Sequence, residues 1–153
     1  KSGLTMNEVA LIQKESNLPM DVISQFHSMK EYLVYKKAGL KPVIVNGRVA
    51  LVQDIDLNYV SELSDGTKVT NLERMQRGFA PIEPATGKAY ELHHIGQKAD
   101  GTLAVLTRDQ HRKNASILNQ PGKASEIDRL GFGNTRKDFW EYAGTYVFGN
   151  GGV

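Results

Sequence analysis

The sequence predicts an α+β fold, and three observations support this prediction. Apolar residues recur at helical spacing over residues 5–38, an Asn-Gly pair separates two short apolar runs, and residues 88–119 follow a strand–turn–strand–helix pattern. Apolar and aromatic residues over 124–143 predict a last helix. Because the chain has 153 residues and no internal repeat, we expect one domain over residues 1–153.

The composition restricts the classes of protein to which the chain can belong. Hydrophobic residues make up 40% of it, which is enough for a globular core and too many for a disordered chain. There is no cysteine, so disulfides and cysteine-ligated zinc are excluded. No stretch approaches the roughly 18 consecutive apolar residues of a membrane-spanning helix. The formal net charge of +2 permits a nucleic-acid partner without indicating one.

The N-terminal part is expected to be helical. The letters TMNE place a glutamate three residues after Thr5, which is the spacing of a capping box. Pro19 divides the apolar stripe into two predicted helices, 5–17 and 19–38, and Gly39 suits the C-terminal cap. The stripe is most simply core, and a partner-binding groove is the less favoured alternative.

Residues 42–87 are expected to hold a small β-hairpin and a polar connector. Asn46 and Gly47 lie between two valine-rich runs, and this dipeptide is a strong short-range hairpin signal. After a polar, turn-rich segment, the letters NLERMQRGFAP predict a short helix over residues 71–81 with Asn71 as its N-cap.

The unit over 88–119 contains three of the four histidines. We expect strands over 88–95 and 102–107, followed by a helical turn that begins at the capping residue Thr107. The three histidines are His93 and His94 at the end of the first strand and His111 on the helix. The glycine-rich tail after residue 143 is expected to be loose.

Two adjacent histidines at a strand end suggest a metal site with a free base beside it. Neighbouring residues on a strand point to opposite faces, so one imidazole can turn toward the helix while the other stays free. A neutral imidazole with a pKa close to working pH is a suitable general base, and a divalent ion can stabilise the charge that develops during phosphodiester hydrolysis. For the site as a whole, we expect the imidazoles of His93, His94 and His111 to converge around one cation-sized space.

A structural interpretation competes with this one. The pair can equally be a polar strand edge plus one satisfied core histidine, and His111 lies among polar residues, where a solvent-facing histidine is common. His27 lies in the N-terminal stripe, far from the others in sequence. We interpret it as a packing histidine without a chemical role.

The same residues resemble a known family. The segment ELHHIGQKADGTLAVLTRDQHRKNASILN, with SEIDR and RKDFW downstream, closely resembles the LHH branch of the HNH/endonuclease VII superfamily of nucleases. Upstream blocks such as NGRVALVQDIDLN extend the resemblance over residues 5–142. Such domains are C-terminal toxin domains of large secreted bacterial polymorphic toxins. The resemblance implies a ββα-metal core (HNH, or His-Me finger) over 88–119, within the α+β domain.

The resemblance also implies residue roles. His93 would ligate one divalent metal ion, His94 would be the general base that activates water, and His111 would be a second metal-site residue. Where the family pattern ends with a histidine, this chain has Asn119. An amide oxygen is a weaker ligand than imidazole for zinc, nickel or copper, although it can ligate a hard ion.

Three explanations of Asn119 stay open. It is a natural ligand that favours Mg²⁺ or Mn²⁺, an introduced change that inactivates a toxic enzyme, or a residue outside the site. We expect one divalent ion, Mg²⁺, Mn²⁺ or Zn²⁺, as the cofactor.

Four cations near the expected metal site are candidates for DNA contacts. In nucleases of this type the metal finger lies against the phosphate backbone, so non-specific affinity comes from such cations. They are Lys98 in the hairpin turn and Arg108, Arg112 and Lys113 on the helix. The competing interpretation is a solvated surface that is paired with Asp109. Because nothing resembles a base-reading module, we expect little sequence specificity.

The leading hypothesis is a metal-dependent, largely sequence-non-specific DNA endonuclease that acts as an antibacterial toxin. The alternatives are an RNase and a catalytically silent domain that binds nucleic acid or a protein partner. The resemblance implies a cognate immunity protein, for which an acidic surface is expected, and leaves the oligomeric state open. It also implies secretion by a specialised system and action in the cytoplasm of a target cell. The start, KSG, has neither methionine nor a signal-peptide core and suggests an excised domain of a longer protein.

Overall fold

The computed structural model describes residues 3–120, 122 and 129–150. The predicted start of the last helix at 124, its residue Ile127 and most of the SEIDR motif lie outside these residues. The helices are α1 (Met6–Ser16), α2 (Met20–Ile23), α3 (Met29–Lys37), α4 (Asn71–Gln76), α5 (Arg108–Lys113), α6 (Ala115–Leu118) and α7 (Arg129–Tyr142), with short turns η1 (Ile95–Gln97), η2 (Ala143–Val147) and η3 (Phe148–Asn150). The strands are β1 (Lys41–Val45), β2 (Arg48–Val52), β3 (Val60–Glu62), β4 (Lys68–Thr70), β5 (Glu91–His94) and β6 (Leu103–Leu106).

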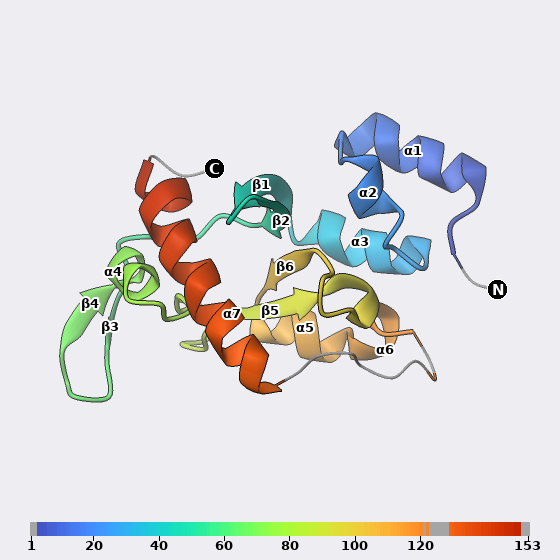
Figure 1. Ribbon diagram of the computed structural model, residues 1–153. Coiled ribbons are helices and arrows are strands. Elements are labelled where there is room, and N and C mark those ends of the chain that lie inside the picture. The colour runs from blue at the N-terminus through green and yellow to red at the C-terminus, as the bar shows by residue number, and fades with distance from the viewer. Residues whose placement is uncertain (1–2, 121, 123–128, 151–153) are drawn as a thin grey trace.

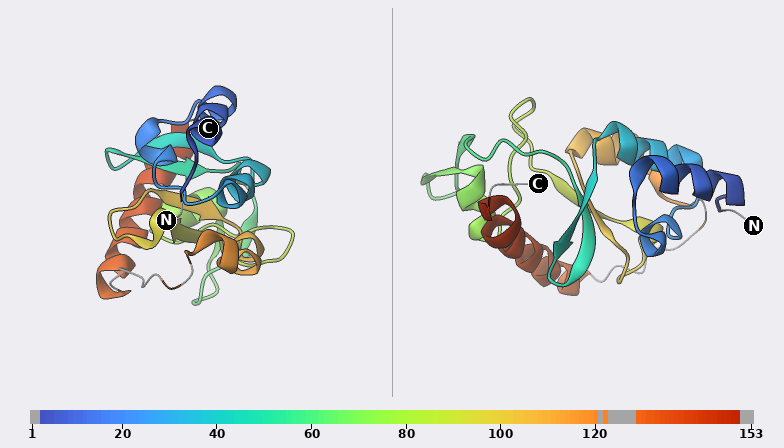
Figure 2. Two further views of the ribbon diagram at one scale, coloured as in Figure 1. Left: turned by 90° about the vertical axis from the view of Figure 1, so that its right-hand side faces the viewer. Right: turned by 90° about the horizontal axis from the view of Figure 1, so that it is seen from above.

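A central sheet lies between two helical layers, which confirms the α+β class (Figure 1). The N-terminal helices cover one side of the sheet, and α4 and α7 cover the other, as the view from above shows (Figure 2). None of the described helices combines the length and the apolar character needed to cross a membrane.

The central sheet has the strand order β1-β2-β6-β5. β1 and β2 form the predicted hairpin, and Asn46 (φ 53°) and Gly47 (φ 77°) adopt the left-handed conformations that its tight turn needs. β2 runs parallel to β6, whereas β5 pairs antiparallel with β6, so that His93 lies opposite Ala104. β5 is therefore at the edge of this sheet.

Each face of the central sheet packs against its own hydrophobic cluster. Since side chains alternate along a strand, Leu51 joins one cluster and Val52 joins the other. The first cluster contains buried residues of α1, α2, α3 and α6: Ile12, Val22, Ile23, Tyr32, Tyr35 and Leu118. The second contains buried residues of α4, α7 and the segment that follows α7: Met75, Phe139, Trp140, Ala143 and Phe148. The apolar stripe of the N-terminal helices is therefore core.

The N-terminal helices differ from the prediction at one point. The capping box of α1 is confirmed, since Thr5 and Glu8 bind each other's backbone amides. A single helix over 19–38 is wrong, because the chain leaves the helical conformation after α2 and a new N-cap at Ser28 starts α3. The Ser28 hydroxyl accepts a hydrogen bond from the backbone amide of Glu31 at 3.1 Å.

The connector contains a strand pair where only turns were expected. β3 and β4 form a separate two-stranded antiparallel sheet. The N-cap of α4 is Thr70 rather than the predicted Asn71, because Thr70 and Glu73 form a capping box. Asn71 is buried instead, and its side-chain amide binds the backbone of Asp56 and Ile82. This amide holds the connector in place, so the capping role falls to its neighbour.

The described part of the tail, residues 143–150, is packed rather than loose, contrary to the prediction. Residues 143–150 continue in helical turns. Gly144 packs so closely on α4 that a Cβ atom there would lie 2.7 Å from the Cβ of Met75. Phe148 is buried in the second cluster. The small glycine and this aromatic side chain anchor the segment to the fold.

Candidate active site

The two adjacent histidines lie on opposite faces of β5. His93 faces α5, where its ring centroid is 5.2 Å from that of His111. His94 faces α7 and contacts Phe132 edge-on, with the ring centroids 4.6 Å apart. The structure thus brings His93 and His111 together and separates His94 from them. The expected convergence of all three rings on one space is wrong, because strand alternation directs the two neighbours apart.

His111 is oriented by a carboxylate on β5. Thr107 is the N-cap of α5, as predicted, and forms a capping box with Gln110 that sets the first turn of the helix. His111 Nδ1 lies 2.9 Å from Oε1 of Glu91. A carboxylate can only accept a hydrogen bond, so Nδ1 of His111 is the donor, and this bond selects the tautomer whose lone pair is on Nε2.

Glu91 holds two side chains of α5 at once. Besides His111 it binds Arg112, whose Nη2 lies 2.7 Å from Glu91 Oε2. Partial burial acts to raise the pKa of Glu91, but the hydrogen bonds and charges of Arg112 and His111 together lower it. Glu91 was not a predicted site residue. Its position two residues before His93 puts both side chains on the same face of the strand, and this signal could have identified it.

His93 is a buried imidazole with an unused nitrogen. Only 4% of the residue is exposed, and its Nε2 has no hydrogen-bond partner within the described part of the chain. Burial first, and then the charges of the neighbouring histidines, lower the pKa of His93 to about 3. His93 is therefore neutral at physiological pH, which is the form that a metal ligand requires.

The imidazoles of His93 and His111 fit a divalent cation if an oxygen ligand is added to them. Across residues 3–120, 122 and 129–150, no group of three or more His, Cys, Asp or Glu side chains is placed to hold a metal ion. His93 and His111 supply two imidazoles, and Asn119 lines the same cleft as His111. The amide oxygen of Asn119 and water would complete a mixed nitrogen and oxygen set. Such a set is compatible with metals that accept both kinds of ligand.

Residues of β5, α5, α6 and α7 line an open cleft of about 750 Å³. Its lining includes Glu91, His111 and Asn119. The positively charged residues of the lining are Arg108, Arg112 and Arg136. The cleft thus combines two of the metal-ligand candidates, His111 and Asn119, with the positive charge that a polyanion requires, whereas His93 is buried behind His111.

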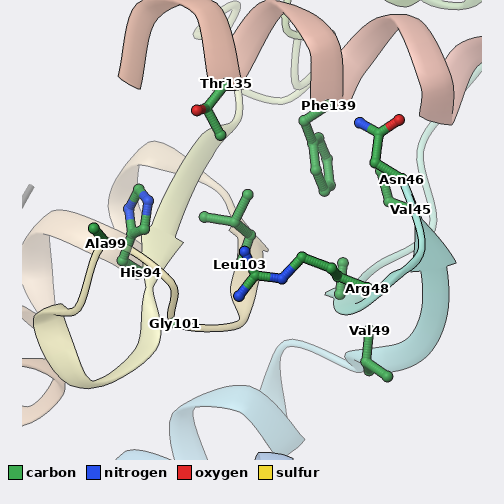
Figure 3. Close-up of a pocket in the computed structure, with 11 residues that line it drawn as sticks. Val45, Asn46, Arg48, Val49, His94, Ala99, Gly101, Leu103, Thr135 and Phe139 are labelled. Atoms are coloured by element: carbon green, nitrogen blue, oxygen red, sulfur yellow. The ribbon is translucent and has the colours of Figure 1, made fainter. Parts of the chain in front are cut away.

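His94 lines a smaller pocket of about 90 Å³ on the other face of the sheet (Figure 3). The side chain of Arg48, from β2, extends toward His94 across this pocket, and Thr135 of α7 lies on another wall. Burial, and then the nearby charge of Arg48, lower the pKa of His94. The ring is therefore neutral at pH 7 and can accept a proton. Phe132, which contacts His94, also lines the cleft, so the Phe132 ring lies between His94 and the cleft.

A buried polar cluster lies next to His93 on the N-terminal side. Glu31 of α3 is fully buried, accepts a hydrogen bond from the Tyr35 hydroxyl at 2.6 Å and lies 2.8 Å from His27 Nδ1. Burial raises the pKa of Glu31 despite these partners. The Tyr35 ring centroid is 6.4 Å from that of His93. His27 therefore pairs with a core carboxylate, which agrees with a structural role.

The four predicted DNA-binding cations do not form one surface. Arg108 and Arg112 line the cleft together, because residues four apart on a helix lie on the same face. Lys113 lies in a different groove, against α3, and pairs with Asp109 at 3.6 Å. Lys98 is exposed after η1 and is not part of the cleft lining.

Two arginines near the histidines were not predicted. Arg136 lies over the Phe132 ring, with Cζ 5.1 Å from its centroid. It belongs to the RKDFW motif, so the sequence contained a signal for it. Arg48 comes from β2, and only the parallel pairing of β2 with β6 brings it toward β5. No short sequence pattern predicts that Arg48 lies near β5.

One of three comparisons with known proteins found a match. One family model matches residues 70–144, about half of the chain, and is described as a nuclease of the HNH/ENDO VII superfamily with conserved LHH. The match includes β5, β6 and the helices that line the cleft, whereas α1 to α3, β1 and β2 lie outside it. No curated protein and no solved structure matches the chain.

Proposed function

Residues 70–144 form an LHH-type nuclease domain of the HNH/endonuclease VII superfamily, and on this premise we propose a metal-dependent, largely sequence-non-specific DNA endonuclease that acts as an antibacterial toxin. One observation supports this most. The neutral, buried His93 has an unused Nε2, and its ring lies 5.2 Å from the ring of His111, which Glu91 orients. Histidines that serve only packing are expected to use their buried nitrogens in hydrogen bonds.

His93, His111 and Asn119 are the proposed ligands of one divalent ion, Mg²⁺, Mn²⁺ or Zn²⁺. When bound, such an ion supplies positive charge that stabilises the phosphate during hydrolysis. Glu91 contributes by keeping the proton on Nδ1 of His111, which leaves Nε2 available. The place of Asn119 in the cleft lining favours a ligand position over a position outside the site. Whether the residue is natural or introduced is a separate question, which the Asn119→His variant addresses.

His94 is the proposed general base. Its ring is neutral at pH 7, so it can take a proton from a water molecule that attacks phosphorus in line and displaces the 3′ oxygen. Phe132 contacts His94 and also lines the cleft. This contact supports a strand in the cleft that would pass close to the base. The separation of His94 from the two other rings also suits a base that must stay free of the metal.

The cleft is the proposed DNA-binding surface. Arg108 and Arg136 are available for phosphates, whereas the charge of Arg112 is partly neutralised by Glu91. Contacts of this kind are non-specific and weaken steeply with salt. The same chemistry cleaves RNA, so an RNase is the second candidate, and a silent binding domain is the third.

The toxin role and its setting are further parts of the proposal. The support is the resemblance to C-terminal toxin domains of secreted bacterial proteins. A cognate immunity protein with an acidic surface would protect the producer by covering the arginine-lined cleft. The domain would leave the producer through a specialised secretion system and act in the cytoplasm of the target cell.

A cleavage assay tests this function. Supercoiled plasmid and a matched RNA are incubated with the protein and Mg²⁺, Mn²⁺ or Zn²⁺, in parallel with the His94→Ala and Asn119→His variants. We expect DNA cleavage that requires metal and is lost in His94→Ala, and Asn119→His is expected to be at least as active as the present chain. Preferential cleavage of RNA would favour the second candidate. DNA binding without cleavage by any variant would favour the silent domain.

A further inference from the structure

The pocket that contains His94 has the charge pattern of an anion site. Of the described residues that line it, Arg48 alone carries a permanent charge, and none carries a carboxylate. Thr135 adds a hydroxyl to the wall. The volume of about 90 Å³ is well above the roughly 10–15 Å³ that one water molecule requires. Arg48 is an exposed residue whose side chain borders the pocket, and a cation that faces such a space without an anionic partner in the lining is expected to attract one.

Two features of the fold position Arg48, namely the hairpin turn that precedes it and the pairing of β2 with β6. Arg48 is the first residue of β2, directly after the tight turn at Asn46 and Gly47. The parallel pairing of Ala50 with Leu103 places the start of β2 beside the turn that precedes β6. There Nη2 of Arg48 donates a hydrogen bond to the carbonyl of Asp100.

That turn is itself tightly packed. At Gly101 a Cβ atom would lie 2.3 Å from the carbonyl oxygen of Ile95. The turn between η1 and β6, which contains the acceptor of Arg48, is therefore packed closely against the backbone of Ile95. A guanidinium has five N–H donors in a planar fork, so one bond to a carbonyl leaves others for a ligand.

We propose that Arg48 binds a phosphate of the nucleic acid next to His94, so that the hairpin outside the family match supplies part of the phosphate site. The inference rests on the nuclease function proposed above. A phosphodiester fits the pocket because it carries one negative charge and several acceptor oxygens, which an arginine fork recognises. Arg48 would hold the phosphate on the side of the base, while the cleft arginines hold the rest of the strand.

Two binding measurements test this without cleavage. First, inorganic phosphate is titrated into the metal-free protein in EDTA, and the ring signals of His94 are followed by NMR. Second, a fluorescent DNA duplex is titrated by anisotropy at several salt concentrations. In Arg48→Ala we expect the phosphate response of His94 to disappear and DNA binding to weaken about tenfold, with the salt slope reduced by about one phosphate contact.

Two further variants separate the ligand role from a structural one. Arg77→Ala removes an exposed arginine at the end of α4, outside the pocket and the cleft, and is expected to bind like the wild type. Arg48→Lys keeps the charge but not the fork, and is expected to bind with intermediate affinity. If Arg48→Ala does not fold, Arg48→Lys replaces it as the test variant.

Unchanged phosphate and DNA binding in Arg48→Ala would overturn the proposal. So would an equal loss in Arg77→Ala, since the effect would then be general charge. The phosphate response at His94 is independent of cleavage. A chain that binds phosphate through Arg48 but never cleaves DNA would contradict the nuclease function and leave the phosphate site in place.

Discussion

The two faces of β5 place adjacent histidines in different surroundings. On one face, His93 is enclosed by the N-terminal core and lies beside a second imidazole that a carboxylate orients. On the other face, His94 shares a small pocket with an arginine and an aromatic ring of α7. Burial lowers the pKa of both rings, but the neighbours differ. One face collects donors for a cation, and the other collects groups for an anion.

This difference shows how a single strand can separate two chemical roles. A ligand and a base made from adjacent residues do not compete for the same ion, because the pleat directs them apart. Each histidine then contacts residues from a different helical layer of the fold. The predictions below test the division between the two faces, from the largest expected effect to the smallest.

Removal of each histidine is expected to have the largest effect and the clearest contrast. His94→Ala should lower kcat for DNA cleavage by about 10²–10⁴-fold, because a general base is lost, and should leave metal affinity unchanged. His93→Ala should abolish cleavage and metal binding together. Plasmid cleavage rates and calorimetric metal titrations give the two readouts, with Asn119→His as the parent if the present chain is inactive. Equal losses of metal affinity in His94→Ala and His93→Ala would show that the two histidines do not have separate roles.

Loss of Glu91 is expected to affect the His93 face alone. Glu91→Ala should lower metal affinity about 10–100-fold, because the orienting partner of a ligand imidazole is removed. DNA binding in EDTA should not weaken, since Arg112 is released from its ion pair. Glu141→Ala, which breaks an exposed pair with Lys137, is the matched control and should change neither quantity. Unchanged metal affinity in Glu91→Ala would remove His111 from the proposed ligand set.

The next largest expected difference between the two histidines is in how the free energy of unfolding depends on pH. The pKa of His93 is about 3 in the folded protein against an ordinary 6.5, so the unfolded chain binds the proton first as pH falls. The free energy of unfolding of the metal-free protein should therefore fall between about pH 6.5 and pH 3. His93→Leu should remove on the order of 2 kcal/mol of this loss near pH 4.5, and His94→Leu should remove less. Urea unfolding at several pH values measures both, and parallel curves for the wild type and His93→Leu would contradict the expectation.

The smallest expected effect is a shift of the pH profile on the His94 face. Cleavage should rise with pH through the pKa of His94, which lies below the ordinary 6.5 because of burial and the charge of Arg48. Arg48→Ala removes that charge, so the acidic limb of kcat/KM should move to higher pH. Rates at saturating metal across pH 5 to 8 measure the limb. An acidic limb that stays at the same pH would show that Arg48 does not act on this ring.

Much of the site could be predicted because its signals are local. The capping boxes at Thr5 and Thr107, the hairpin turn at Asn46 and the alternation of His93 and His94 each depend on residues within a few positions of one another. The misplaced N-cap at Asn71 and the broken helix at Ser28 are also local. Thr70 and Asn71 are both residue types that cap helices, and Asn71 is buried while Thr70 forms the capping box.

The sequence by itself determined the residue types of the site, their spacing and their assignment to a strand and a helix, because backbone geometry follows from near neighbours. Only the tertiary structure decided which side chains meet across the fold. The pairing of β2 with β6 brings Arg48 to His94, and the packing of α7 encloses that pocket and one wall of the cleft. Such contacts join segments far apart in the chain, and they depend on how whole layers pack rather than on any short pattern.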